Sequence, residues 1–205
     1  MFILGLTGSI GMGKTTAAQI FRQLKVPVYD ADGVVHEFMG ENGAGVDLVG
    51  EAFEGVVSKG CVDRQALGEH VFDDEPALSA LEAIVHPFVI SRQLMFLKIA
   101  ASQRRPLVVL DVPLLFETGG EANCDAVAVV SAPQYLQKIR VMGRPGMTEK
   151  KLRAILQRQM SDQEKRRRAD FIIPSGLGKR RSLQSIQEII KVAITSPSTH
   201  WRPGA

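Results

Sequence analysis

Short apolar runs alternate along the chain with segments of helical spacing, a pattern typical of α/β proteins. The runs at residues 2–6, 107–111 and 125–131 are nearly continuous and contain β-branched residues, as expected of strands buried on both faces of a parallel sheet. Two shorter runs, Pro27–Tyr29 and Asp170–Ile173, predict further strands. The pattern therefore predicts an α/β fold with a parallel sheet flanked by helices.

Segments between these runs have apolar residues three or four positions apart. Residues 14–24 show this spacing, so the first 32 residues are predicted to form a strand, a helix and a second parallel strand joined by a right-handed crossover. A closing helix is predicted over residues 182–194. The tail at 196–205 contains Pro, Ser and Gly, and we expect it to be frayed.

A long helical stretch interrupts the predicted sheet after its second strand. Residues 32–105 show no convincing strand-like alternation, have a Gly-rich break at 40–50, and include an amphipathic segment from Pro87 to Ala101. The core sheet is predicted to resume only at Leu107. This stretch is therefore predicted to be a helical insertion.

A second helical insertion follows the strand at 125–131. A helix from Pro133 to Val141 is predicted to be broken at Pro145-Gly146, and a new helix over 148–159 to begin with Thr148 as its N-cap. Ser161 and Glu164 then match a capping box.

The 205 residues, 45% of them hydrophobic, are enough for one well-filled core, so we expect one domain with insertions. No run of about 18 apolar residues and no signal peptide pattern is present, which predicts a cytoplasmic protein that does not enter a membrane. The two cysteines do not form a disulfide framework, and the four histidines lack the spacing of a zinc site. A catalytic thiol stays an alternative.

Charge is distributed unevenly along the chain. Residues 138–168 contain eleven Lys or Arg and three Asp or Glu, a local net charge of +8, so the rest of the chain carries −5 within a total of +3. A basic patch of this kind is compatible with binding either nucleic acid or a small polyphosphate.

Residues 8–15, GSIGMGKT, match the phosphate-loop pattern GxxxxGK[ST] between a predicted strand and a predicted helix. Glycines allow backbone N–H groups to turn toward an anion at the helix N-terminus, the lysine reaches the β- and γ-phosphates, and the threonine hydroxyl can ligate Mg²⁺. The pattern predicts that ATP binds through Gly8, Gly11, Met12, Gly13, Lys14, Thr15 and Thr16, with Lys14 also catalytic.

Three aspartates end predicted strands, where ligands of parallel α/β sheets bind. Asp30 is predicted to cap the following helix, and Asp32 to be the base that orients an acceptor hydroxyl and takes its proton. Asp111 is predicted to hold Mg²⁺ together with Thr15, although a role in capping the turn into Pro113 is the alternative.

Arg140 and Arg144 are four residues apart in the basic insertion, so one helical face would present both to transferring phosphates. We expect Arg140 to be catalytic and Arg144 to bind the nucleotide, with a solvated basic face as the alternative. For Lys165 to Arg168 the solvated face is the preferred interpretation.

Several runs together resemble the dephospho-coenzyme A kinase family, over about residues 2–190. The resemblance rests on the phosphate loop and on an ordered set of shorter runs, namely Tyr29–Asp32, Val62–Leu67 leading to Val71-Phe72, Leu81–Pro87, Asp111–Glu117, Arg140 with Arg144, and Gln159 before Ala169-Asp170.

The resemblance implies a P-loop fold in three parts: a core (about 1–30, 106–138 and 169–195), a helical substrate-binding insertion (about 31–105) and a lid (about 139–168). It implies transfer of the ATP γ-phosphate to the ribose 3′-hydroxyl of dephospho-coenzyme A, the last step of coenzyme A synthesis, with Mg²⁺. Asp32 matches the family's proposed base, and Asp32, Arg64 and His86 match positions that bind substrate. For His86 a buried structural role is the alternative.

Some residues depart from the family pattern. Ser9, Met12 and Thr15 stand where Gly, Ser and Ser are common, but the loop glycines and lysine are present. Pro145 replaces a usual acidic residue and Ser175 a usual asparagine, so the lid hinge and the contact to adenine depart from the family pattern at these positions.

Three other functions are alternatives to this one. Another P-loop kinase would share the loop, the lid and the sheet. A regulatory GTPase is suggested by a DxxG match at residues 30–33, but this sequence has no later NKxD to read guanine. A nucleic-acid-binding module is disfavoured by the aromatic content of 6%. The sequence leaves the oligomeric state open between a monomer and a weak homo-oligomer.

Overall fold

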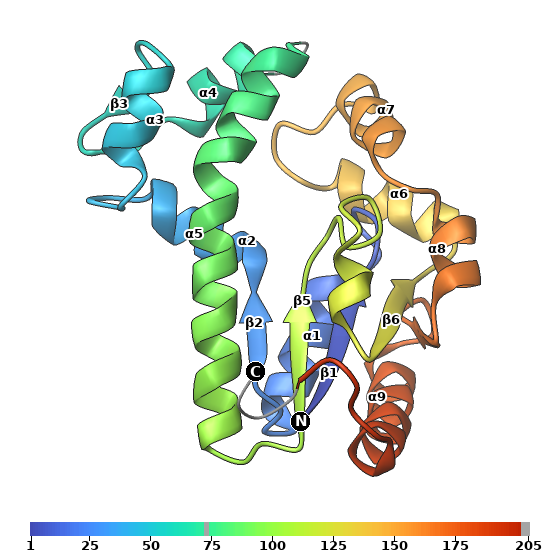
Figure 1. Ribbon diagram of the computed structural model, residues 1–205. Helices are drawn as coiled ribbons and strands as arrows, with labels where there is room; N and C mark the ends of the chain where they lie inside the picture. Colours follow the sequence, from blue (N-terminus) through green and yellow to red (C-terminus); the bar gives the residue numbers. More distant parts are fainter. Residues whose placement is uncertain (72–73, 202–205) are drawn as a thin grey trace. The chain divides into compact units, whose positions relative to one another are not determined.

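The computed structural model describes residues 1–71 and 74–201, and these form two compact units. Unit 1 contains residues 1–29 and the chain from residue 99 onward, and unit 2 contains residues 30–98. Phe72, quoted in the family resemblance, and residues 202–205 of the tail lie outside the described residues. Figure 1 shows the elements of both units.

A five-stranded sheet forms the centre of unit 1 and confirms the predicted α/β fold with its parallel core. Its strands lie in the order β2 (Val28–Asp30), β5 (Leu107–Asp111), β1 (Phe2–Thr7), β6 (Ala126–Ser131) and β7 (Phe171–Pro174). β1 pairs in parallel with β5 and β6, and β6 pairs in parallel with β7. β1, β5 and β6 are buried along their whole length, which explains their continuous apolar sequence.

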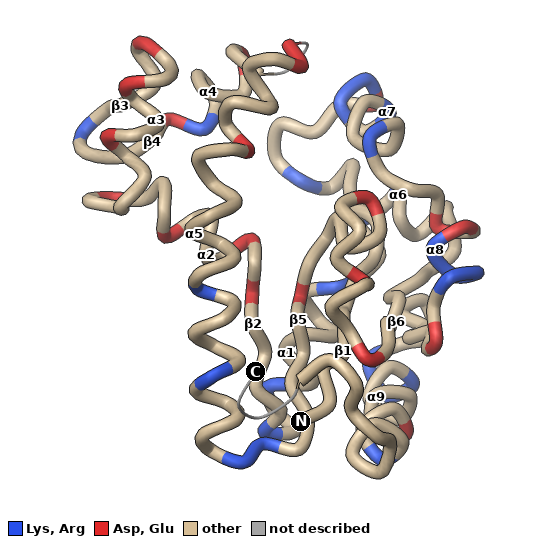
Figure 2. The backbone as a smooth tube through the Cα atoms, viewed as in Figure 1, with Lys and Arg blue, Asp and Glu red and all other residues tan. Residues whose placement is uncertain are grey.

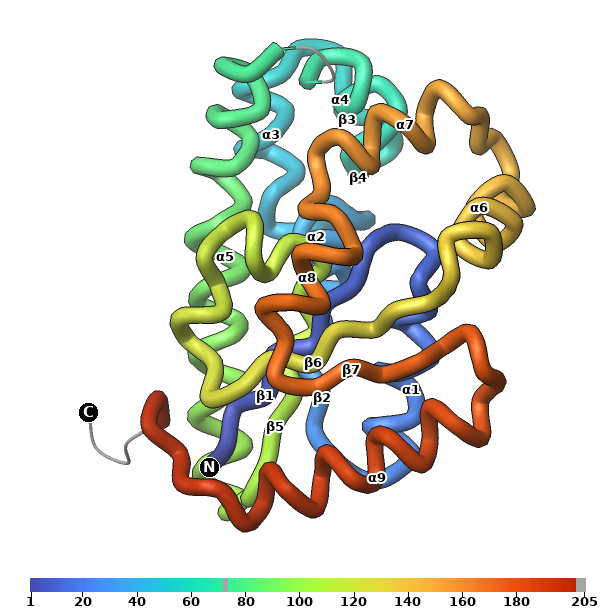
Figure 3. The backbone as a smooth tube through the Cα atoms, turned by 90° about the vertical axis from the view of Figure 1, so that its right-hand side faces the viewer, coloured from blue at the N-terminus to red at the C-terminus, as the bar shows by residue number. Residues whose placement is uncertain are grey.

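Helices α1 (Lys14–Gln23) and α9 (Lys179–Thr195) pack beside one another on the sheet (Figure 3). Alternate strand residues such as Leu4, Leu6 and Val109 join Phe21 of α1 and Ile186 of α9 in one buried cluster. The apolar residues at every second position of the strands thus pack against those at every third or fourth position of the helices in a single core. This core fixes the position of β1, and so of the start of the loop that follows it.

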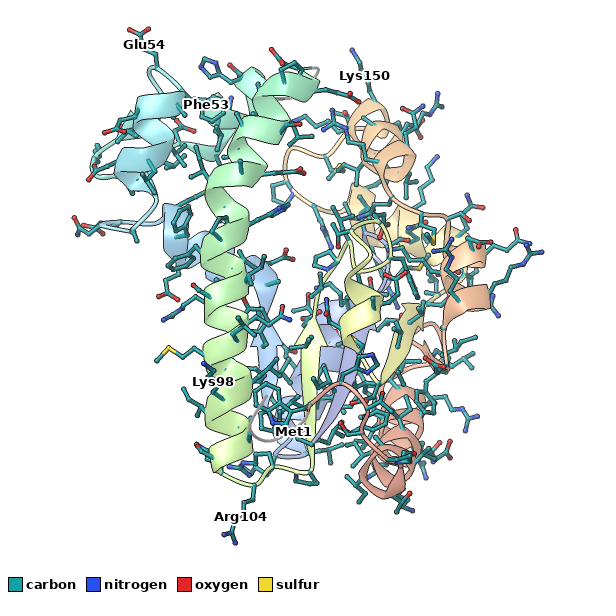
Figure 4. The ribbon with its side chains drawn as sticks, in the orientation of Figure 1. Met1, Phe53, Glu54, Lys98, Arg104 and Lys150 are labelled. Atoms are coloured by element: carbon teal, nitrogen blue, oxygen red, sulfur yellow. The ribbon has the colours of Figure 1, made fainter. Side chains whose placement is uncertain are left out.

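The chain between β6 and β7 forms α6 (Gln134–Met142), α7 (Glu149–Arg158) and α8 (Asp162–Arg168). Thr148 and Ser161 cap α7 and α8, accepting hydrogen bonds from the N–H groups of Lys151 and Glu164, which confirms both predicted caps. Figure 2 shows Lys and Arg gathered on α7 and α8, and Figure 4 shows Lys150 projecting away from α7.

Two expectations about this basic segment are wrong. α6 ends at Met142 with Gly143 as its C-cap, so the exposed Arg144 lies beyond the helix and does not share a helical face with Arg140. Lys165 is fully buried rather than solvated, and its Nζ lies 2.9 Å from Glu117 Oε1 and 3.1 Å from Pro113 O. A buried ammonium needs such partners because its desolvation is costly.

Unit 2 consists of α2 (Ala31–Met39), α3 (Val46–Ala52), α4 (Arg64–Val71), most of α5 (Glu75–Ser102), and a two-stranded antiparallel hairpin of β3 (Val57–Ser58) and β4 (Cys61–Val62). The prediction that residues 32–105 contain no strand is therefore wrong. Lys59 and Gly60 both have positive φ, 50° and 74°, which is the geometry of a two-residue hairpin turn. The Lys-Gly pair was the sequence signal for this hairpin.

The core of unit 2 gathers around Phe38, whose ring centroid lies 4.6 Å from that of Phe88 on α5. α5 begins twelve residues before the predicted start at Pro87, and it continues through this proline. Leu81 and Ile84, in the turns before it, pack against the buried cluster, so tertiary contacts outweigh the proline's local cost. By length and composition alone α5 could span a membrane, a test that helices of soluble proteins also pass.

The described part of the C-terminal tail is not frayed, contrary to expectation. Asp125 accepts hydrogen bonds from the N–H groups of Ile3, Thr199 and His200, and Ser198 Oγ donates to Met1 O. Burial favours a higher pKa for Asp125, but these hydrogen bonds outweigh it and lower the pKa to about 2. One carboxylate thus joins the chain's tail to the start of β1.

Candidate active site

The phosphate loop follows β1 directly and ends at the N-terminus of α1, as predicted. Gly11 and Gly13 have φ of 76° and 92°, values that a residue with a Cβ seldom adopts, and Gly13 is the N-cap of α1. Gly8 approaches the backbone of β6 so closely that an added Cβ would lie 2.7 Å from Val130 O. Each of these glycines is therefore required by the loop's path.

Lys14 and Asp111 meet at the head of the sheet. Lys14 Nζ lies 2.7 Å from Asp111 Oδ1, and Asp111 is buried at the end of β5. β1 and β5 are neighbours in register, Leu6 opposite Asp111, so the sheet brings the two residues together across 97 positions of sequence. Thr15 is exposed in the first turn of α1, Thr16 is half-buried, and the buried Met12 donates its N–H to Ser9 O.

Arg140 lies on α6 and contacts the phosphate loop. Its Nη1 donates to Gly11 O at 3.3 Å and to Ser175 Oγ at 3.0 Å, and its Nη2 donates to Ser175 O at 2.9 Å. Ser175, which follows β7, in turn donates to Met12 O. The arginine is thus positioned at the loop by backbone and serine oxygens, whereas Arg144 takes no part in this arrangement.

Two glutamines that sequence reasoning did not assign also contact the loop. Gln137 Nε2 donates to Ile10 O at 2.8 Å, and Ile10 N donates to Gln159 Oε1 at 3.0 Å. Gln137 precedes Arg140 by three residues and so shares its face of α6, a spacing that could have indicated it. Gln159 was noted only as part of the family resemblance.

A buried strand, a loop with glycines at positive φ and a lysine–aspartate ion pair match the pattern predicted for a nucleotide-phosphate site. Comparison with known proteins assigns the family. Residues 2–177 match the family model described as dephospho-CoA kinase. The chain belongs to the dephospho-CoA kinase family. It is accordingly a kinase of the final step of coenzyme A synthesis, with ATP as the phosphoryl donor.

Relatives of this family resemble the chain over nearly its full length. A dephospho-CoA kinase of Rhodospirillum rubrum is 50% identical over 204 residues, covering 98% of this chain and 96% of its own. One from Paramagnetospirillum magneticum is 58% identical over 166 residues, covering 81% and 78%. The resemblance inferred from the sequence is thereby confirmed.

Solved structures of a dephospho-CoA kinase and of other proteins share the fold. A Thermus thermophilus protein matches with a TM-score of 0.83 at 34% identity, covering 95% of this chain and 98% of its own. A dephospho-CoA kinase from Campylobacter jejuni matches with a TM-score of 0.62 at 26% identity, covering 93% and 96%. A shikimate kinase from Acinetobacter baumannii, TM-score 0.54 at 17% identity with 96% of each chain covered, shares the fold alone.

The residues predicted to bind the acceptor in this dephospho-CoA kinase family member lie in unit 2. Asp32 is exposed in the first turn of α2, directly after Asp30, whose Oδ1 accepts from Gly33 N and caps the helix as predicted. Arg64 is the exposed first residue of α4. His86 is exposed on α5, so the alternative of a buried structural histidine is wrong.

The buried Cys124 is poorly suited to act as a nucleophile. Burial raises the pKa of Cys124 to about 12, with the neighbouring Asp125 adding to the effect, so the thiol is protonated at neutral pH. Cys61 lies on the hairpin of unit 2, where its Sγ donates to Ser58 O. Among the described residues no group of three or more His, Cys, Asp or Glu side chains could hold a metal ion.

Proposed function

We propose that the chain transfers the γ-phosphate of ATP to the ribose 3′-hydroxyl of dephospho-CoA, with the phosphate loop and Lys14 binding the nucleotide. The Lys14–Asp111 contact carries this proposal, because it fixes a cation beside the loop's N–H groups at the end of a buried strand. Phosphoryl transfer depends mainly on such positioning and charge neutralisation.

The oxygen atoms at the loop fit a magnesium ion. Mg²⁺ prefers a few protein oxygens together with phosphate oxygens and water, and it seldom uses a cage of protein ligands. The Thr15 hydroxyl at the start of α1 and the Asp111 carboxylate at the end of β5 supply such oxygens. When bound, the ion would neutralise phosphate charge, and Thr15 and Asp111 would hold it.

We also propose roles for the remaining predicted residues in this reaction. Asp32 orients the acceptor hydroxyl and takes its proton, a contribution of roughly 10²–10⁴ in rate. Arg64 and His86 bind dephospho-CoA, and Arg140 neutralises charge on the transferring phosphate. Arg144 binds the nucleotide from the predicted lid, beyond the end of α6.

The proposed division of labour follows the predicted parts. Residues of about 1–30, 106–138 and 169–195 form the core, those of about 31–105 bind the acceptor, and those of about 139–168 form a lid that excludes water from bound ATP. The protein acts in the cytoplasm on a small molecule, without nucleic acid or membrane as a partner, as a monomer or weak homo-oligomer. The positive charge of its lid attracts the triphosphate of ATP.

A panel of acceptors tests the proposal. Purified protein receives ATP and Mg²⁺ with dephospho-CoA, adenosine, AMP or shikimate, and ADP release and product mass are measured. ADP release with dephospho-CoA alone, and a product heavier by one phosphate, is the expected result. Turnover with another acceptor alone would overturn the assignment, and equal use of GTP would revive the GTPase alternative.

A further inference from the structure

The peptide groups of Ile10, at the bend of the phosphate loop, are held by glutamine side chains. Gln137 donates to the Ile10 carbonyl from α6, and Gln159, the C-cap of α7, accepts from the Ile10 N–H. Gln137 is only 5% exposed, so its amide is committed to this contact. Gln137 precedes α7 in the sequence and Gln159 follows it, yet both side chains contact the same residue of the loop.

The neighbouring carbonyls of the loop are occupied in the same way. Gly11 O accepts from Arg140 and Met12 O accepts from Ser175. In a planar trans peptide the C=O of one residue and the N–H of the next point in opposite directions. Holding the carbonyls of Ile10 and Met12 on the outside therefore directs the N–H groups of Gly11 and Gly13 to the other side, where we propose that the nucleotide phosphates bind.

We propose that Gln137 and Gln159 are positioning residues for ATP binding: they fix the Ile10 peptides so that the N–H of Gly11 faces the nucleotide phosphates. They touch no phosphate themselves and act through the backbone. The inference deepens the proposed function, since it concerns how the same loop binds its nucleotide. It also makes the order of the loop depend on the position of α7, because Gln159 terminates that helix.

Steric contacts support this arrangement. Val141 of α6 lies against Gly11, where an added Cβ would also approach Gln137 O to 3.1 Å. The loop is therefore packed as well as hydrogen-bonded along α6. If the glutamines served packing alone, their replacement would change the stability of the protein and leave its affinity for ATP unaffected. Measuring both quantities therefore distinguishes a packing role from a positioning role.

Calorimetric titration of ATP, without any acceptor, tests the proposal in Gln137→Met, Gln159→Met and the double variant. Methionine keeps the length of the side chain and removes its amide. Gln157→Met, an exposed position on α7, is the matched control. Thermal unfolding of each variant is recorded beside the titration, so that a change in affinity is read only from folded protein.

Each single variant is expected to raise the Kd for ATP about three- to tenfold, the range for one lost hydrogen bond. The double variant is expected to raise it by less than the product of the two, since both side chains fix one residue. Gln157→Met is expected to bind as the wild type does. An unchanged Kd in both single variants, or a strictly multiplicative double variant, would overturn the proposal.

Amide hydrogen exchange of the wild-type protein gives a test that needs no variant. The Ile10 amide is expected to exchange slowly before ATP is added, whereas the Gly11 and Gly13 amides slow only after its addition. Rapid exchange of Ile10 in the absence of ATP would contradict the proposal. Neither experiment depends on the acceptor, so failure of the dephospho-CoA assignment would leave both results interpretable.

Discussion

Unit 1 and unit 2 present their predicted functional residues in different ways. In unit 1, Lys14, Asp111 and Arg140 come from three elements and are joined to one another or to the phosphate loop by polar contacts. In unit 2, Asp32, Arg64 and His86 are exposed on three separate helices. The predicted donor residues are thus connected within one compact unit, whereas the predicted acceptor residues lie on separate helices of the other unit.

The largest expected effect comes from removing the cation of the donor side. Lys14→Ala is expected to lower kcat by at least about 10²–10³-fold, because alanine has no ammonium at the start of α1 to neutralise the β- and γ-phosphates. Steady-state kinetics measures this, with the exposed Lys150→Ala on α7 as a control of equal charge change. Activity near the wild-type level in Lys14→Ala would remove the loop from the mechanism.

Asp32→Asn tests the acceptor side. It is expected to lower kcat roughly 10²-fold or more while changing the Kd for ATP little, because the amide cannot take the hydroxyl proton. Asp30→Asn is the matched control, since asparagine also caps helices and the structure uses Asp30 as the N-cap of α2. Equal losses in both variants would assign the effect to the helix and would exclude Asp32 as the base.

Lys165→Met sharpens the comparison by testing a buried polar contact of unit 1. The change leaves Glu117 without its ammonium partner, and breaking a buried pair typically costs about 3–5 kcal/mol in the free energy of unfolding. Denaturant unfolding measures the loss, and Lys165→Met with Glu117→Leu is expected to recover part of it. A single variant as stable as the wild type would show that the pair does not anchor α8.

The Asp125 contact predicts a smaller effect with a defined pH dependence. Its pKa is lowered from 3.8 to about 2, so its ionised form stabilises the folded state by about 2 kcal/mol above pH 4, and this contribution is lost as pH falls through 2. Asp125→Asn is expected to lose that amount at pH 7 and to match the wild type near pH 2. Chemical unfolding at several pH values measures it, and a pH-independent difference would contradict the account.

Sequence patterns predicted the elements whose local signals agree with the tertiary structure. The strand at Leu107–Asp111 and the caps Thr148 and Ser161 were predicted because burial and capping act over a few residues. The hairpin at Val57–Val62 was missed because each strand has only two residues, too few to show a period. Its Lys-Gly turn was the sole local sign.

Long-range polar contacts were beyond the reach of these patterns. Lys165 belongs to a run of four basic residues, and its contacts with Glu117 and Pro113, 48 and 52 positions away, distinguish it from the exposed arginines that follow. Gln137 and Gln159 likewise acquire a role only when the fold brings them to Ile10. The motif predicted where ATP binds, whereas the residues that shape the loop needed three-dimensional structure.

Equilibrium binding of ATP to a variant carrying Asp32→Asn, Arg64→Ala and His86→Ala tests most directly whether the donor side is complete within unit 1. The account predicts a Kd for ATP within about twofold of the wild-type value, well below the tenfold change that 1.4 kcal/mol would produce, together with loss of transfer to dephospho-CoA. A folded triple variant that no longer binds ATP would contradict it.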